Sequence, residues 1–143
     1  MKYAYSLKTL RVKEKDFPYD GQSIRSTSEL VAFARSLQDC DVEKFLVLYL
    51  DAQNHIICIR VTEGTVNQCV VYPRELFRHA LLAGASAVIL IHNHPSGETK
   101  PSDADVRLTR TITEAGKVFD IIVHDHTIIA GSRFFSFREE GLL

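Results

Sequence analysis

The chain has 143 residues, of which 45% are hydrophobic, and its formal net charge is -1 at pH 7. This length suits a single domain with a real core, and the charge provides none of the basic excess that proteins use to hold nucleic acid by its phosphates. Its odd number of cysteines (Cys40, Cys58 and Cys69) and its lack of a CxxC pair argue against a secreted disulfide framework. With no membrane-length apolar run and no signal-peptide pattern, we expect a cytoplasmic protein that does not enter the membrane.

The N-terminal residues differ in pattern from the rest. Residues 3–15 alternate loosely between apolar and polar side chains and carry Lys8, Arg11, Lys13 and Lys15, which is typical of a solvent-facing edge strand or an extended arm. We therefore expect residues 1–25 to form an arm that packs on a domain made of residues 26–143.

The domain itself begins with a predicted helix and a predicted hairpin. Ser26 and Glu29 form a capping signal that opens the helix, and residues 39–41 end it. The residues on its apolar face are Leu30, Phe33, Ala34 and Leu37. A strand at residues 43–50 and a partner strand at residues 55–61, joined by a polar turn, then form the hairpin.

The remaining elements alternate between strand and helix. In chain order, we predict a strand at 68–72, a helix at 73–83, a buried strand at 87–91, a helix at 103–115 and a strand at 119–130. Pro73 suits the first turn of its helix and Gly84 the end, while Gly116 is expected to stop the next helix. The pattern predicts an α/β fold with a mixed central sheet flanked by helices.

The most informative stretch is residues 92–105, at the end of the buried strand. His92 and His94 are spaced by two on an extended chain and so share a face. Asp105 returns on the first turn of the next helix, after a loop rich in Pro, Gly and Ser. Two histidines and one carboxylate leave a fourth position open for water, which is typical of a catalytic and not a structural zinc site.

Simpler interpretations of these residues exist. Ser102-x-x-Asp105 is also a helix capping signal, and His-x-His pairs are common without metal. The conjunction of strand, histidine pair, loop, serine and aspartate in one order favours the metal. A second pair, His124 and His126, also shares a face by spacing but lacks the loop and the later carboxylate. We expect it, with Asp125, to support the site or to play a structural role.

The motif carries a family resemblance. His-x-His-Pro, six residues, Ser, two residues and Asp resembles the JAMM (MPN+, JAB) metalloprotease motif, and the matching positions are His92, His94, Pro95, Ser102 and Asp105. Longer strings, such as YPRELFRHALLAGASAVILIHNHPSG and the ending DHTIIAGSRFFSFREEGLL, resemble the RadC family, a bacterial branch of that fold. The resemblance runs from about residue 28 to the C-terminus. It implies a JAB/MPN domain with the layered architecture also seen in cytidine deaminases.

The resemblance also implies a chemistry. It is that of a zinc metallohydrolase that cleaves a peptide or isopeptide bond, with one zinc ion held by His92, His94 and Asp105. By analogy with the position of the catalytic glutamate in JAMM enzymes, Glu43 would be the general base, and Ser102 would stabilise the oxyanion. The simpler interpretation of Glu43 is an ordinary solvated residue at an element boundary.

Two departures leave the partner open. Full-length RadC proteins carry a helix-hairpin-helix region that this chain is too short to hold, and Asn93 stands where deubiquitinating relatives have Ser or Thr. A protein or peptide substrate is the first expectation. The alternative is a non-catalytic RadC-like module that binds protein or DNA; the family is traditionally linked to DNA repair, although nothing in the sequence shows repair. The signatures of zincins, zinc deaminases, P-loops and nucleophile elbows are absent.

Overall fold

The computed structural model describes residues 21–64 and 70–143, and its five described strands form one mixed sheet. The elements in chain order are α1 (Thr27–Phe33), the 3-10 helix η1 (Arg35–Asp39), β1 (Lys44–Leu50), β2 (Ile56–Glu63), α2 (Pro73–Ala83), β3 (Ala87–Asn93), α3 (Asp103–Val118), β4 (Ile122–Ala130) and β5 (Arg133–Ser136). The strand order is β2-β1-β3-β4-β5, in which β3 and β4 run parallel and the other neighbours antiparallel. The predicted α/β class with a mixed sheet is confirmed.

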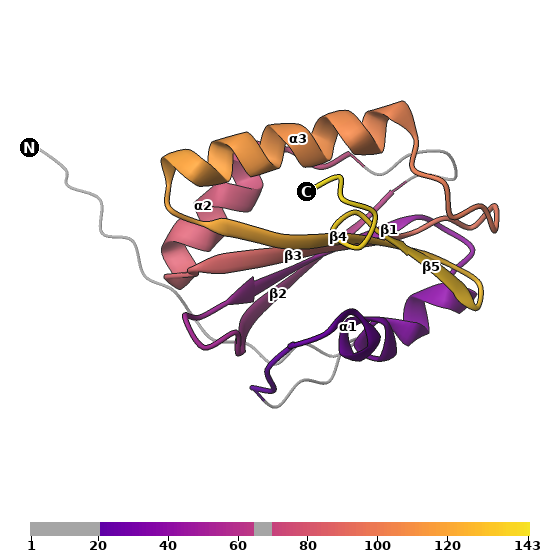
Figure 1. Cartoon of the computed structure of the whole chain (residues 1–143), viewed down its shortest axis with the longest axis horizontal. Helices are drawn as coiled ribbons and strands as arrows, with labels where there is room; N and C mark the ends of the chain where they lie inside the picture. The colour runs from indigo at the N-terminus through magenta and orange to yellow at the C-terminus, as the bar shows by residue number, and fades with distance from the viewer. Residues whose placement is uncertain (1–20, 65–69) are drawn as a thin grey trace, which may run out of the picture.

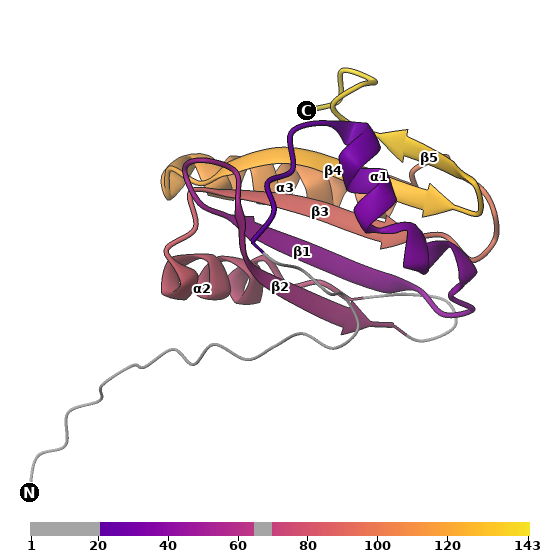
Figure 2. The same cartoon turned by 90° about the horizontal axis from the view of Figure 1, so that it is seen from below.

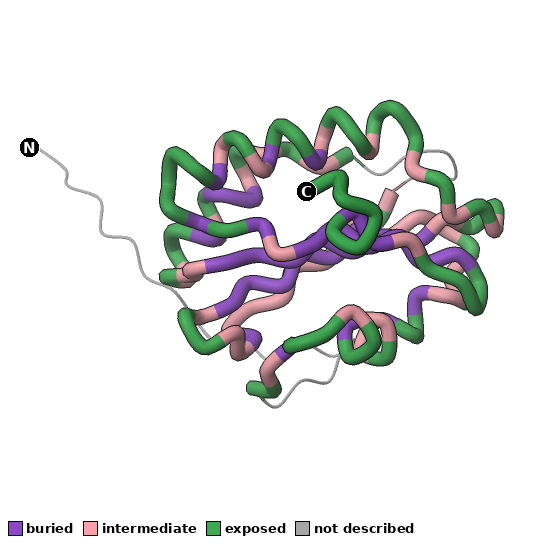
Figure 3. Tube along the Cα trace, viewed as in Figure 1, coloured by how far each residue is buried: buried purple, intermediate pink, exposed green. Residues whose placement is uncertain are grey.

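Helices cover both faces of the sheet. α2 and α3 lie on one face, and α1 with η1 lies on the other (Figures 1 and 2). Because side chains alternate along a strand, β1 and β3 contribute to a hydrophobic core on each face of the sheet. Leu46 and Ile91 pack toward α1, whereas Val47 and Leu90 pack toward α2 and α3. Figure 3 shows the result, with buried strands between helices whose outer sides are exposed. No helix within the described ranges is both long and apolar enough to cross a membrane.

The first helix begins where the sequence predicts. Ser26 caps α1 by accepting a hydrogen bond from the Glu29 N–H at 3.2 Å, and the helix tightens into η1 before ending at Cys40. Ahead of it, the Ile24 N–H donates to the Asn54 carbonyl, so the chain just before α1 lies against the β1–β2 turn. Residues 1–20 of the predicted arm lie outside the described residues.

The hairpin of β1 and β2 is confirmed, with shifted ends. β1 begins at Lys44, one residue later than predicted, and β2 extends to Glu63. The turn between them is closed by Asp51, whose carboxylate accepts the N–H groups of Gln53 and His55 at 2.9 Å. Glu43 therefore lies just outside the sheet, at the entrance to β1.

The predicted strand at residues 68–72 is wrong in its described part. Gln68 and Cys69 lie outside the described residues, and residues 70–72 pair with none of the described strands. Val70 and Tyr72 are 50% and 65% exposed, so their alternation belongs to a surface connection that leads into α2. Tyr72 is the residue before that helix, which begins at Pro73 and ends at Gly84 in the left-handed conformation (φ 68°), as predicted.

Gly116 does not end its helix as predicted. α3 continues to Val118, and Gly116 is buried within it. A Cβ atom at this position would collide with the carbonyl oxygen of Ile121, and the Ile121 N–H donates back to the Gly116 carbonyl at 2.9 Å. The glycine is therefore required by the close approach of the next segment, and not by the end of the helix.

The ends of β3 and the last hairpin also differ from the prediction. β3 continues through His92 and Asn93, both of which are buried. β4 begins at Ile122, later than predicted. β5 was not predicted; the two-residue turn after Ala130, with Gly131 at a φ of 59°, is the signal that identifies this hairpin.

Candidate metal centre

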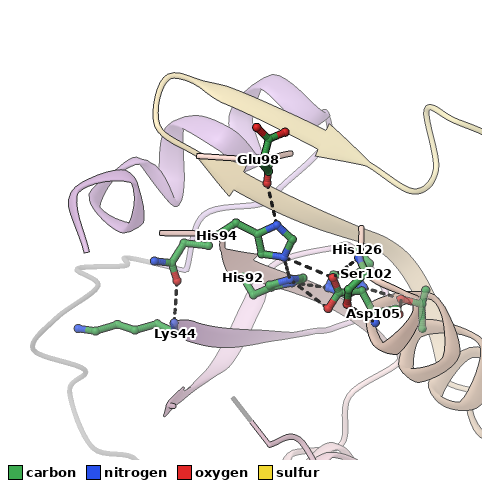
Figure 4. A network of polar contacts seen from close by, with 9 residues as sticks. Lys44, His92, His94, Glu98, Ser102, Asp105 and His126 are labelled. Carbon is green, nitrogen blue, oxygen red and sulfur yellow. Dashed lines mark hydrogen bonds and ion pairs between the residues drawn. The ribbon is translucent and has the colours of Figure 1, made fainter. Parts of the chain in front are cut away.

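Three predicted ligands converge at one end of the sheet. His92 is the penultimate residue of β3, His94 follows the strand, and Asp105 lies on the first turn of α3 (Figure 4). The two Nε2 atoms are 2.9 Å apart. Oδ1 of Asp105 lies 3.3 Å from Nε2 of His92, and Oδ2 lies 3.3 Å from Nε2 of His94. Within the part of the chain that the structure describes, this is the cluster that could hold a metal ion.

The loop that carries His94 is fixed at several points. The His94 N–H donates to the Ile129 carbonyl at 2.8 Å, and the Gly97 N–H closes a turn onto the His94 carbonyl. The Arg133 guanidinium donates to the Gly97 carbonyl at 2.7 Å, which ties the loop to β5. Nδ1 of His94 lies 2.7 Å from the Glu98 carbonyl. A carbonyl can only accept, so Nδ1 carries the proton and Nε2 presents a lone pair.

His92 is oriented by a buried chain of hydrogen bonds. Its Nδ1 lies 2.8 Å from Nε2 of His126, and Nδ1 of His126 lies 2.6 Å from Oγ1 of Thr109. The Thr109 hydroxyl donates to the Asp105 carbonyl at 2.6 Å. Because the Thr109 hydroxyl donates there, it accepts from Nδ1 of His126, and Nε2 of His126 in turn accepts from Nδ1 of His92. Nε2 of His92 therefore carries no proton and presents a lone pair, as Nε2 of His94 does.

The three ligand atoms fit a tetrahedral metal. Two lone pairs and a carboxylate so close together repel one another unless a cation or a proton lies among them. Metal–ligand bonds of about 2 Å, as zinc makes, place the vertices of a tetrahedron about 3.3 Å apart. The two histidine–aspartate distances match this spacing, and the 2.9 Å between the histidines is slightly shorter. Three protein ligands leave one position for water or substrate.

Protonation of the site follows from the same contacts. The hydrogen bond with Asp105 raises the pKa of His94 above its ordinary value, although burial opposes the shift. Burial pushes the pKa of Asp105 upward, but hydrogen bonds from protonated His92 and His94 in the metal-free protein outweigh this effect. The pKa of the carboxyl therefore stays well below its usual range. Burial holds the pKa of His126 well below its ordinary value, so this ring is neutral.

Aromatic rings fix the planes of the buried histidines. Phe45 stacks on His92 with ring centres 5.5 Å apart and an angle of 11°, and Phe137 stacks on His126 at 4.8 Å and 10°. Sequence reasoning missed both phenylalanines and also Thr109. Phe45 could have been found by pairing the two strands, because it lies directly opposite His92 in the β1–β3 register.

Ser102 and Asp105 form the capping box of α3, and the Asp105 carboxylate also lies against the two histidines. The Ser102 N–H donates to Oδ2 of Asp105 at 2.8 Å, and the Asp105 N–H donates to Oγ of Ser102 at 3.1 Å. The helix cap therefore orients the candidate ligand, and the two interpretations of this pair are compatible. No described contact uses the proton of the Ser102 hydroxyl.

Glu43 lies beside the cluster. Phe45 pairs with His92 in the antiparallel register, so Glu43, two residues earlier, falls opposite His94. Glu43 is half-buried. Its charge adds to the effect of the Asp105 hydrogen bond in raising the pKa of His94, which agrees with this placement. Its role as a base stays a prediction.

The second His-x-His pair does not share a face, contrary to expectation. The β3–β4 register shifts between Val123 and Asp125, so His124 is the extra residue of a bulge. Nε2 of His124 lies 2.8 Å from Oδ1 of Asn54, and His124 lines a cavity of about 410 Å³ under α1. His126 alone reaches the metal cluster.

Asp125 faces the same cavity as His124, away from the metal cluster. Its carboxylate accepts hydrogen bonds from the Ser136 hydroxyl at 2.6 Å, from the Thr127 hydroxyl at 3.2 Å, and from the N–H groups of His126 and Arg138. Asp125 thus contacts the backbone of His126 but not its ring, and it joins β4 to the C-terminal segment.

Comparison with known proteins identifies the family. The profile described as "RadC-like JAB domain" matches residues 24–142. The chain belongs to the RadC-like JAB domain family. It is 48% identical over 112 residues to a UPF0758 protein of Pelobacter propionicus, an alignment that covers 78% of this chain and 49% of that relative.

Further relatives carry the same name. UPF0758 protein YkfG of Escherichia coli is 41% identical over 138 residues, which cover 95% of this chain and 87% of YkfG. A UPF0758 protein of Trichlorobacter lovleyi is 48% identical over 112 residues, covering 78% of this chain and 49% of that protein. The chain thus spans about half the length of the Pelobacter and Trichlorobacter relatives. These names state no substrate or reaction.

Proposed function

We propose that this domain is a zinc-dependent metallohydrolase of JAMM type that hydrolyses a peptide or isopeptide bond. The observation that carries the proposal is the convergence of Nε2 of His92, Nε2 of His94 and the Asp105 carboxylate, with both Nδ1 protons committed elsewhere. Bound zinc would polarise a carbonyl and lower the pKa of a coordinated water toward neutrality.

The residues around the ligands supply the remaining parts. Glu43, half-buried at the entrance to β1, accepts the proton of the attacking water and returns it to the leaving amine. The Ser102 hydroxyl, whose proton no described contact uses, donates to the developing oxyanion. The backbone N–H of Ser102 meanwhile donates to the Asp105 carboxylate and holds it in place. Phe45 and Phe137 exclude water from the rear of the histidines.

A non-catalytic module that binds protein or DNA is the alternative. A net charge of -1 does not favour a DNA-binding surface. A module that only binds has no use for a carboxylate at the position of Glu43 or for a fully oriented ligand set with an open fourth position. We therefore propose hydrolysis as the function.

The experiment is a cleavage screen. The purified protein is incubated with a peptide library and with isopeptide-linked substrates, before and after removal of metal by a chelator and again after zinc is restored. The proposal predicts cleavage that disappears with the chelator and returns with zinc, and a His92→Ala variant that shows none. If zinc-loaded wild type cleaves no substrate, or only those that His92→Ala cleaves as well, the binding module is the better account.

A further inference from the structure

Asn93 lies between the two histidine ligands but points to the opposite face of the sheet. It is only 2% exposed, although it carries a polar amide. Because side chains alternate along β3, His92 and His94 face α3 while Asn93 faces the chain between η1 and β1. A buried amide at this place needs partners, and all those that the structure describes belong to one short segment.

The Asn93 side chain holds the backbone of residues 40–44. The Lys44 N–H donates to Oδ1 of Asn93 at 2.6 Å, a contact drawn at Lys44 in Figure 4. Nδ2 of Asn93 donates to the Val42 carbonyl at 3.0 Å and to the Cys40 carbonyl at 3.4 Å. The regular β1–β3 register ends at the pair of Phe45 and His92, so the amide continues the hydrogen bonding one step beyond the sheet.

These contacts bracket Glu43. Val42 and Lys44 are its two neighbours in the chain, and both are bonded to Asn93. The Glu43 carbonyl itself accepts the Gly64 N–H at 2.8 Å. Residues 41–43 belong to no helix or strand, so the bonds of Asn93 to Val42 and Lys44 and the bond from Gly64 are the described hydrogen bonds that fix this stretch of backbone. A general base needs such support, because a displacement of about 1 Å can cost on the order of a hundredfold in rate.

We propose that Asn93 is a positioning residue that holds Glu43 beside the metal ligands. This inference rests on the proposed function, since it assigns Asn93 the task of placing the base. The ordinary alternative is a buried amide that stabilises the loop without any effect on the base.

The deciding experiment measures where Glu43 lies without requiring hydrolysis. Wild type, Asn93→Ala and the milder Asn93→Ser are loaded with cobalt(II), and NMR records the paramagnetic effect on the carboxyl carbon of isotope-labelled Glu43. The control is Asn54→Gly, which removes an amide that bonds His124 on the α1 face of the sheet and keeps a backbone that glycine accepts (φ 65°). We expect at least a twofold weaker effect in Asn93→Ala, an intermediate one in Asn93→Ser, and the wild-type effect in Asn54→Gly.

Three further measurements complete the test. In the metal-free protein, exchange of the Lys44 amide hydrogen should accelerate at least tenfold in Asn93→Ala, while zinc affinity of the same variant should stay within about threefold of wild type. On a cleaved substrate, Asn93→Ala combined with Glu43→Gln should be no slower than Glu43→Gln alone, because both changes remove the same base.

The results that overturn the proposal differ from those that overturn hydrolysis. Asn93 does not act through Glu43 if the paramagnetic effect of cobalt on Glu43 is unchanged in Asn93→Ala. The same conclusion follows if the double variant is slower than Glu43→Gln by the factor that Asn93→Ala costs alone. A wild-type protein that cleaves no substrate overturns the proposed function alone, because the cobalt and exchange measurements still decide whether the amide places the carboxylate.

Discussion

Nε2 of His126 lies 2.8 Å from Nδ1 of His92, and this contact joins the second histidine pair to the first. The hydrogen-bond chain from Thr109 to His92 could run in either direction. If the Thr109 hydroxyl donated to His126, the protons would shift along the chain, and His92 would carry its proton on Nε2. Only the direction in which Thr109 accepts leaves Nε2 of His92 free for a metal.

Thr109→Val should therefore weaken zinc binding. The variant leaves Nδ1 of His126 buried without its partner, so the tautomer that suits the metal becomes costly. We expect a loss in affinity of about 10- to 100-fold, measured by competition with a chromophoric chelator. Thr109→Ser should keep wild-type affinity, and so should Thr113→Val, which makes the same change one turn along α3. Equal affinity in all four proteins would show that Thr109 does not orient the ligand.

Removal of either histidine ligand should abolish stoichiometric zinc. His92→Ala or His94→Ala leaves two protein ligands, which rarely hold zinc at micromolar concentrations. Metal analysis of the purified variants checks this directly. Full occupancy in either variant would mean that the ligands have been assigned wrongly.

Asp105→Asn separates the ligand from the helix cap. The amide oxygen can still accept the Ser102 N–H, but it is a poorer metal ligand than the carboxylate. We expect zinc to be lost while the helix content, measured by circular dichroism, stays close to that of wild type. The opposite pattern, with zinc fully bound and thermal stability reduced, would indicate that Asp105 serves only as the cap.

Zinc binding should depend on pH through His94. Its pKa lies above the ordinary 6.5, chiefly because of the Asp105 hydrogen bond, so protons compete with zinc at a higher pH than for an isolated histidine. Apparent affinity, measured from pH 8.5 to 5.5, should begin to fall above pH 6.5. An inflection below pH 6.5 would contradict this assignment.

The raised pKa of His94 also affects the stability of the metal-free protein, but in the opposite direction: zinc affinity falls as the pH is lowered, whereas stability falls as the pH is raised. The folded protein holds the His94 proton more tightly than the unfolded chain does. This contribution to the free energy of unfolding is therefore fully present below pH 6.5 and is lost as the pH rises through the raised pKa of His94. Thermal unfolding of the metal-free protein over the same pH range measures it, with His94→Gln as the reference that lacks the contribution.

Much of the fold and the three ligands could be predicted because the signals are local. Pro73 and Gly84 bound α2 through their own backbone preferences, and the apolar run of β3 identifies a buried strand. His92 and His94 share a face because their spacing matches the period of a strand. Ser102 and Asp105 belong to one helix turn, so their capping contacts follow from sequence alone.

Contacts between strands could not be predicted in this way. The bulge at His124 changes which residues of β4 face α3, and a single-residue shift leaves no mark in the spacing of histidines. The contacts of His126 with His92 and Thr109 depend on that register. At Gly116 the signal is visible in the sequence but has two possible causes. A glycine needed for close packing cannot be told by sequence from a glycine that ends a helix.

Glu43→Gln tests the central claim most directly, because it removes the proposed base and keeps its shape. Zinc content and thermal stability should match wild type, while metal-dependent cleavage should fall on the order of a hundred- to ten-thousand-fold. Asp41→Asn and Glu63→Gln, which alter exposed carboxylates nearby, should cleave like wild type. Wild-type cleavage by Glu43→Gln, on a substrate whose cleavage requires the metal, would contradict the account.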